Sequence, residues 1–325
     1  MDNEKILKRE KLRRMLFSFA PAAGLVILFA LFMAFAIVQD INIPYSLKNI
    51  LNQSVIVIVV ATGAIFIYTL GSFDISLGAN MCVSALIGAM VYGRTESLVM
   101  MLGACIASAV IISLTCSVLA SVFNLPVFVT TIAMLSLLNA AVLMLIGTNG
   151  TGDIIQVPAE AVSSINTIGF KLIVLLAYLA VCVFAFSFLK LGRQEKFMGG
   201  NPVCAALSGL NNSKLAICAF ALAGLGVGLG AFLTITYAPT LSRNTASSVG
   251  MDVIISIVFG GMPVSGGARS RIYSASIGAL SMTLLSQIML MMNLNSGISQ
   301  MVKAVIFLLV VFISMNDGRK TILPR

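Results

Sequence analysis

Three polar segments interrupt an otherwise apolar sequence, and they hold the residues that could bind a solute or a partner. The first, Gly71–Gly78, carries one carboxylate, Asp74, and a hydroxyl two residues later, Ser76. Its glycines permit a tight turn, in which we expect Asp74 to cap the following helix by accepting backbone N–H bonds. A second interpretation places Asp74 and Ser76 on a translocation pathway, because carboxylates at membrane depth are often functional.

The second segment, Gly199–Asn211, has the pattern of a short helix inside a loop. Asn201 suits the N-cap, Pro202 suits the first turn, and Gly209 suits the stop. Taken alone, this is a loop helix. Beside a partner protein, it is a compact projection that could dock into a groove.

The third segment, Gly260–Arg271, contains two Gly-Gly pairs on either side of a proline. This pattern favours a tight turn anchored by Arg269 and Arg271 over direct contact with a solute. We therefore expect a structural role for its four glycines, which are Gly260, Gly261, Gly266 and Gly267.

The composition excludes several kinds of chemistry. The chain has no histidine, and its six cysteines lack metal-ligand spacing, so neither a metal site nor a catalytic triad is expected. No P-loop pattern occurs in the sequence, so the chain itself is not expected to bind ATP. The net charge of +9 comes from basic residues between apolar runs, which indicates membrane topology and no nucleic acid partner.

The elements that position these segments are predicted to be membrane-spanning helices. Hydrophobic residues make up 59% of the chain and charged residues 10%, so a lipid bilayer is the expected partner of its surface. The fold class is an all-α integral membrane protein. About ten spans are expected, namely Phe17–Val38, Asn49–Leu70, Ala79–Tyr92, Leu98–Val122, Pro126–Gly147, Phe170–Leu189, Leu215–Thr236, Met251–Met262, Ile272–Met292 and Ile298–Met315.

One predicted span is too short to cross as a plain helix. Met251–Met262 would reach about 18 Å, whereas the hydrocarbon core is about 30 Å thick. Part of the chain between residues 240 and 267 must then cross as non-helical backbone packed against protein, as in the broken helices of transporters.

Charge asymmetry sets the expected orientation. Most of the 20 basic residues fall on one side of the ten spans, which places both termini in the cytoplasm. The domain organisation is an interfacial N-terminal segment 1–16, one transmembrane domain 17–315 and a cytoplasmic tail 316–325.

In this order and spacing, the three segments resemble motifs of the ribose-type permeases of ABC importers. That family has patterns like G-G-I-D-L-S-V-G, G-G-N-x-x-A-A-x-x-S-G-I and I-G-G-x-x-x-x-G-G, and residues 124–150 are also similar. The resemblance covers roughly Asn49 to Ile313 and implies a type II ABC importer permease fold. The chain departs from the family at Asn139, where many members have arginine, and at Asp252–Ser256, where the family has D-A-I-A-A.

The resemblance implies a transporter subunit and not an enzyme. It would translocate a ribose-like pentose or related monosaccharide by alternating access in the bacterial cytoplasmic membrane. The implied partners are a second permease subunit, two ATP-binding cassette subunits that hold ATP and Mg²⁺, and an extracytoplasmic binding protein. The implied ATPase-coupling residues are Gly200, Asn201, Ala205, Ala206, Ser208 and Gly209, and the pathway candidates are Asp74, Ser76, Phe128, Thr131 and Asn139.

Other interpretations stay open from the residues alone. An ion-driven secondary transporter would need ionisable groups within its spans, and Asp74, Asp252 and Lys303 are the candidates. For Asp252, a helix cap is expected before a pathway role, and Lys303 could reach the membrane surface. The sequence leaves open which sugar is carried and whether two identical subunits pair.

Overall fold

The computed structural model describes the backbone of residues 2–149 and 154–318, and the side chains of residues 20–147 and 154–312. Every predicted span coincides with a helix. These helices are α1 (Asp2–Val38), α2 (Ile43–Thr69), α3 (Leu77–Thr95), α4 (Leu98–Val122), α5 (Val127–Asn149), α7 (Ile168–Ser187), α10 (Asn212–Tyr237), α11 (Val249–Phe259), α12 (Tyr273–Met291) and α13 (Ser296–Gly318).

Seven helices in the described chain are long and apolar enough to cross a membrane, and α11 and the apolar part of α13 are shorter. The prediction of an all-α integral membrane protein is therefore confirmed. The proposed domain boundaries at residues 16 and 315 fall inside the continuous helices α1 and α13, and residues 319–325 of the expected tail lie outside the described residues.

Short elements connect the spans. They are α6 (Ala159–Ser163), α8 (Lys190–Gly200), α9 (Pro202–Leu207) and the 3₁₀ turn η1 (Gly267–Arg269). Two short strands, which no pattern in the sequence predicts, are β1 (Ile154–Gln156) and β2 (Thr240–Ser242), and they pair antiparallel with Ile155 opposite Leu241. They form where the loop after α5 meets the loop after α10, because the backbone N–H and C=O groups of each extended loop find partners in the other.

Helices α2 and α10 form the centre of the bundle, and α10 lies between α2 and α4. Small residues permit the close approach of α10 to α4. A Cβ built on Gly224 would lie 2.9 Å from the Cα of Val110, and one built on Gly228 would lie 2.6 Å from the Cα of Ile106. The two glycines are four residues apart on one helix face, which is the small-residue spacing that lets membrane helices pack tightly.

Two breaks in the helices meet inside the bundle. The first is the non-helical stretch 71–76 between α2 and α3, and the second is the chain that leads from β2 into α11. A Cβ built on Gly78 would lie 2.7 Å from the carbonyl oxygen of Ala246 and 2.8 Å from the amide nitrogen of Gly250. As expected, α11 is too short to span by itself, and its irregular flank packs against protein.

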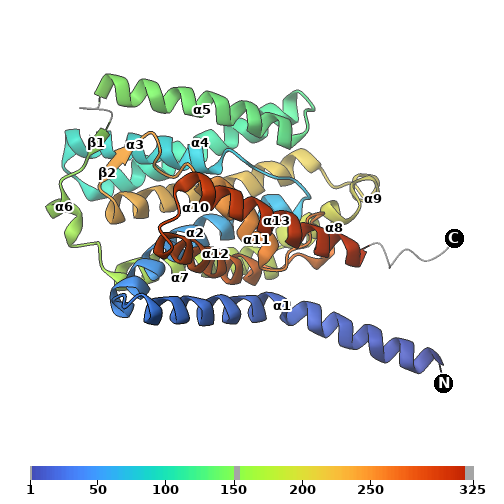
Figure 1. Cartoon of the computed structure of the whole chain (residues 1–325). Coiled ribbons are helices and arrows are strands. Elements are labelled where there is room, and N and C mark those ends of the chain that lie inside the picture. Colours follow the sequence, from blue (N-terminus) through green and yellow to red (C-terminus); the bar gives the residue numbers. More distant parts are fainter. Residues whose placement is uncertain (1, 150–153, 319–325) are drawn as a thin grey trace.

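The two ends of the bundle differ. Figure 1 shows the start of α1 and the end of α13 at the end of the molecule that also holds α8 and α9. The strands β1 and β2 and the short helix α6 lie at the opposite end (Figure 1). The start of the first described helix and the end of the last one thus lie at the same end of the bundle.

Candidate functional site

A cavity of about 320 Å³ lies between α2, α3, α10, α11 and α12. Gln53, Ile56 and Val57 come from the middle of α2, whereas Tyr237 comes from the last turn of α10. Thr234 also comes from α10, and the remaining lining residues come from α3, from the chain between α10 and α11, and from α11 and α12: Met81, Ala238, Thr245, Ala246, Ser248, Val249, Asp252, Met282, Thr283 and Ser286. The second helix break therefore forms one wall of the cavity.

Most polar groups in this wall are uncharged. Thr234 and Thr283 donate their hydroxyl hydrogens to backbone carbonyl oxygens of their own helices. By contrast, Gln53, Ser248 and Ser286 make no side-chain hydrogen bond within the described part of the chain. These three side chains are free to bond a guest in the cavity, as the few polar groups of a small-molecule site do.

Among the described residues of the cavity wall, Asp252 is the one carboxylate, and a lysine from another helix holds it. Lys303 on α13 donates from Nζ to Asp252 Oδ1 at 2.7 Å. Both side chains are mostly buried, with relative exposures of 11% and 13%. Asp252 lies in the first turn of α11, yet within the described residues its carboxylate is bonded to Lys303 and accepts no backbone N–H of that turn. Its position therefore differs from the expected cap, because the buried ammonium group of Lys303 needs an anionic partner.

A second lysine, Lys171 of α7, is buried at the end of the bundle that holds β1 and β2. Its Nζ donates to Asn52 Oδ1 at 2.8 Å and to Asn166 Oδ1 at 2.7 Å. The same nitrogen lies 5.2 Å from the centre of the Tyr237 ring. This cation–π contact fixes the orientation of an aromatic side chain that lines the cavity.

At the opposite end, α9 has the form that its sequence predicts. Asn201 caps the helix by accepting the backbone N–H of Cys204 at 3.1 Å, and Gly209 follows it at a positive φ of 82°. Ala205 is buried, whereas Val203 and Leu207 are 69% and 85% exposed. Two exposed apolar side chains on a short connecting helix suit contact with another protein.

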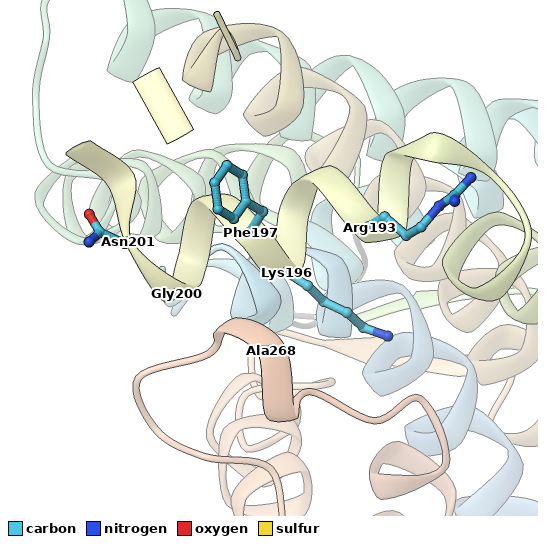
Figure 2. A pocket seen from close by; sticks show the side chains of 6 residues that line it. All are labelled: Arg193, Lys196, Phe197, Gly200, Asn201 and Ala268. Atoms are coloured by element: carbon cyan, nitrogen blue, oxygen red, sulfur yellow. The ribbon is translucent and has the colours of Figure 1, made fainter. Parts of the chain in front are cut away.

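A groove of about 350 Å³ lies beside α9, between α8 and η1. Figure 2 shows its lining, with Arg193, Lys196, Phe197 and Gly200 on α8, Asn201 after it, and Ala268 on η1. Burial lowers the pKa of Lys196, whose Nζ lies 4.2 Å from the centre of the Phe186 ring. Gly200 and Asn201, two of the predicted coupling residues, thus line this groove, and Asn201 is also the N-cap of α9.

A buried carboxylate lies on the same helix. Glu195 of α8 is fully buried, and neither of its carboxylate oxygens has a hydrogen-bond partner within the described residues. Burial raises the pKa of Glu195 to about 9. The side chain is therefore neutral at pH 7, because burying an unpaired charge is costly.

Comparison with known families gives this arrangement its context. The family model described as the permease component of branched-chain amino acid transport systems matches residues 46–314. This match spans most of the chain and includes all three polar segments. The chain belongs to this family of ABC permeases.

Among curated relatives of this permease are three importer subunits. The ribose import permease protein of Escherichia coli K12 is 24% identical over 313 residues, which covers 90% of this chain and 93% of the relative. The L-arabinose ABC transporter permease protein of Azospirillum brasilense is 23% identical over 296 residues, covering 89% and 86%. The autoinducer 2 import system permease protein of E. coli SMS-3-5 is 24% identical over 296 residues, covering 87% and 80%. No solved structure matches the chain significantly.

The first pathway candidates of the permease, Asp74 and Ser76, lie outside the cavity wall. Asp74 Oδ1 accepts hydrogen bonds from the backbone N–H of Ser76 at 2.8 Å and from its hydroxyl at 2.7 Å. Both residues are buried. The carboxylate thus holds the helix break in shape just before α3 begins, through bonds to the residue that precedes the helix.

The candidates on α5 do not line the cavity either. Thr131 is buried, and its hydroxyl donates to the carbonyl oxygen of Phe128 at 2.9 Å. Phe128 is 48% exposed, and Asn139 lies on the exposed side of α5. In the single permease subunit, these two side chains therefore lie on the outer surface of the bundle.

The glycines of the third segment pack elements together at the α8 end of the permease. Gly266 has a φ of 66°, and a Cβ there would collide with the carbonyl oxygen of Tyr68 at the end of α2. A Cβ on Gly267 would lie 2.9 Å from the Cα of Gly200. Gly260 lies against Ser274 of α12, and Gly261 has a φ of 89°. This placement fits a structural turn, which joins α11 to both α2 and α8.

Sequence reasoning missed most of the cavity wall. Gln53, Tyr237 and Ser286 are single polar residues in apolar helices, so no motif marks them. For Asp252, the position before an apolar run favours a helix cap over a pathway role. The available signal was the pair of charges within spans, Asp252 and Lys303, since charges in apolar spans usually pair with each other.

Proposed function

We propose that this permease imports a sugar, a ribose-like pentose or a related monosaccharide, that a binding protein delivers. The named relatives move ribose, L-arabinose and autoinducer 2, and this spread of small polar solutes supports the class. The cavity is the observation that carries the proposal. Its free hydrogen-bonding groups are uncharged, and its one carboxylate already has a lysine partner.

The energy would come from a separate ATPase that acts on the α8–α9 end. In this proposal the ATPase binds the exposed face of α9 and the adjoining groove, with Gly200, Asn201, Ala205, Ala206, Ser208 and Gly209 forming or supporting the contact. Movement of α8 would then pass through η1 to α11, which forms part of the cavity wall. Alternating access follows if that movement opens the cavity to one side of the membrane and then to the other.

The complete importer would contain two permease subunits and two ATP-binding subunits that hold ATP and Mg²⁺. An extracytoplasmic binding protein would deliver the solute to the end that holds β1, β2 and α6. The α8–α9 end would face the bacterial cytoplasm together with both termini. An ion-driven mechanism is less favoured, because Lys303 already neutralises the charge of Asp252, and Asp74 holds the start of α3 through its bonds to Ser76.

Purification of the tagged permease in mild detergent tests the proposal directly. We expect mass spectrometry to find a P-loop ATPase and an extracytoplasmic binding protein, and the binding protein should bind a monosaccharide. The matched control is a permease with Leu207→Asp, which should enter the membrane but lose the ATPase, because it places a charge on the exposed face of α9. Reproducible recovery of the permease alone would contradict the importer assignment.

A further inference from the structure

Two side chains that line the cavity each contact a buried lysine that lies outside the cavity wall. Asp252 is bonded to Lys303, and Tyr237 is covered by Lys171. The lysines come from α13 and α7, whereas the residues that they hold come from α11 and α10. Two independent pairs that converge on one cavity indicate a built binding site.

We propose that Asp252 and Tyr237 bind a neutral, polyhydroxylated solute in this cavity, with Lys303 and Lys171 as the residues that position them. The inference rests on the proposed function and names the groups of the permease that recognise the sugar. Nothing in the three polar motifs marks these four residues.

The chemistry of Asp252 suits a hydroxylated solute. Only Oδ1 is occupied by Lys303, so Oδ2 is left to accept hydrogen bonds from the solute, and no other bond to it occurs within the described residues. A carboxylate offers several acceptor sites and can take more than one hydroxyl hydrogen. Lys303 neutralises the charge, so the wall gains a strong acceptor without a net charge inside the membrane.

The same pairing disfavours an amino acid. A zwitterion would need a free anion for its ammonium group and a free cation for its carboxylate. Asp252 and Lys303 already satisfy each other at 2.7 Å, and separating them would leave charges unpaired in a mostly buried place. The neutral groups Gln53, Ser248 and Ser286 can instead bond hydroxyls of an uncharged guest.

Tyr237 supplies the apolar part of recognition. A sugar ring has faces of C–H groups that pack against an aromatic ring, and Tyr237 also carries a hydroxyl for a polar contact. Lys171 holds the ring from outside the cavity through its own bonds to Asn52 and Asn166. The solute would therefore meet a ring whose orientation is set before binding, which lowers the entropic cost of binding.

The test uses the full complex of permease, ATPase and binding protein in proteoliposomes. The probes are tritiated D-ribose, L-arabinose and D-glucose, and the zwitterion L-leucine is the comparison. The readout is the amount of solute accumulated per ATP hydrolysed. We expect the wild-type complex to accumulate at least one sugar and no leucine. Leucine transport without sugar transport would overturn both the proposed function and the neutral-solute site.

Two variants examine the recognising residues. Asp252→Asn and Tyr237→Leu should each lower sugar accumulated per ATP by about tenfold, the order expected for loss of one strong contact. Asp40→Asn is the control, because Asp40 is an exposed carboxylate outside the cavity wall and its φ of 51° suits asparagine. If sugar moves normally in the wild type and in both variants, the proposed function survives and this inference fails.

A paired variant separates recognition from folding. Asp252→Asn with Lys303→Met removes both charges, and buried ion pairs can often be replaced by neutral groups without loss of stability. We expect this variant to restore assembly relative to Lys303→Met alone but not sugar accumulation per ATP. Full recovery of transport would show that the pair is only structural and would overturn the role of Asp252. If the paired variant does not assemble, Tyr237→Leu still tests the proposed site. Normal sugar transport by Tyr237→Leu would show that Tyr237 does not bind the solute.

Discussion

At the scale of single residues, buried charges in this permease fall into two kinds. Asp252, Lys303 and Lys171 have partners at hydrogen-bonding distance, so burial does not leave them isolated. Glu195 has no such partner within the described residues, and burial raises its pKa to about 9. It therefore keeps its proton in the folded protein over a pH range in which the unfolded chain loses it.

The consequence is a pH-dependent stability. Between the ordinary value of 4.5 and about 9, only the unfolded state ionises Glu195, so wild-type stability falls as pH rises, by about 1.4 kcal/mol per pH unit at most. Glu195→Gln removes this ionisation. We expect the variant to melt at a higher temperature than the wild type at pH 8 and at a similar temperature at pH 5, measured in detergent by differential scanning fluorimetry.

Glu160→Gln is the control for this measurement, because Glu160 is exposed on α6 and should not change the pH dependence. An equal melting temperature for Glu195→Gln and the wild type across pH 5 to 8 would show that Glu195 is ionised in the folded protein.

At the scale of elements, α8 connects the groove with the rest of the bundle, because it lines the groove and also packs against α2. Two adjacent glycines at its end have different surroundings. A Cβ on Gly199 would collide with the carbonyl oxygen of Thr69 in α2, whereas no atom of the described residues lies within 4 Å of a Cβ on Gly200. The first glycine therefore permits helix packing, and the second keeps the groove open.

This difference predicts separate outcomes for the two positions. Gly200→Leu should leave the permease inserted and folded, because its side chain enters open space, but should lower ATPase stimulation and uptake by about tenfold by filling the groove. Gly199→Leu should instead reduce the yield of folded permease. ATPase activity in proteoliposomes and size-exclusion chromatography distinguish the two. Normal coupling in Gly200→Leu would remove this groove from the ATPase contact.

At the scale of the whole molecule, α8, α9 and both ends of the described chain lie at one end of the bundle (Figure 1). The proposed orientation puts this end in the cytoplasm. Cys204 on α9 is exposed there, so it reports the orientation without any substitution.

For the permease expressed without its ATPase, which would otherwise cover α9, a membrane-impermeant maleimide should label Cys204 in inside-out vesicles and not in intact cells. In a Cys204→Ser background, Glu96→Cys should show the reverse, because Glu96 lies in the exposed turn between α3 and α4 at the other end. Labelling of Cys204 in intact cells would reverse the orientation and with it the site of ATPase docking.

Local patterns in the sequence determined much of this architecture. The apolar runs located the spanning helices, because the bilayer requires long stretches without charge. Asn201 and Gly209 set the limits of α9, since capping and helix termination depend on neighbouring backbone groups. The shortness of the segment at α11 likewise predicted a crossing with irregular backbone.

Only the tertiary structure decided where the polar side chains meet. Asp252 and Lys303 are 51 residues apart in the sequence and pair because α11 packs against α13. Lys171 reaches Tyr237 because the end of α10 lies near the start of α7, and no sequence spacing encodes that approach. The meeting of the two helix breaks at Gly78 and Gly250 has the same origin. Local chemistry thus determined the elements, whereas long-range packing of the bundle determined the cavity and the residues that line it.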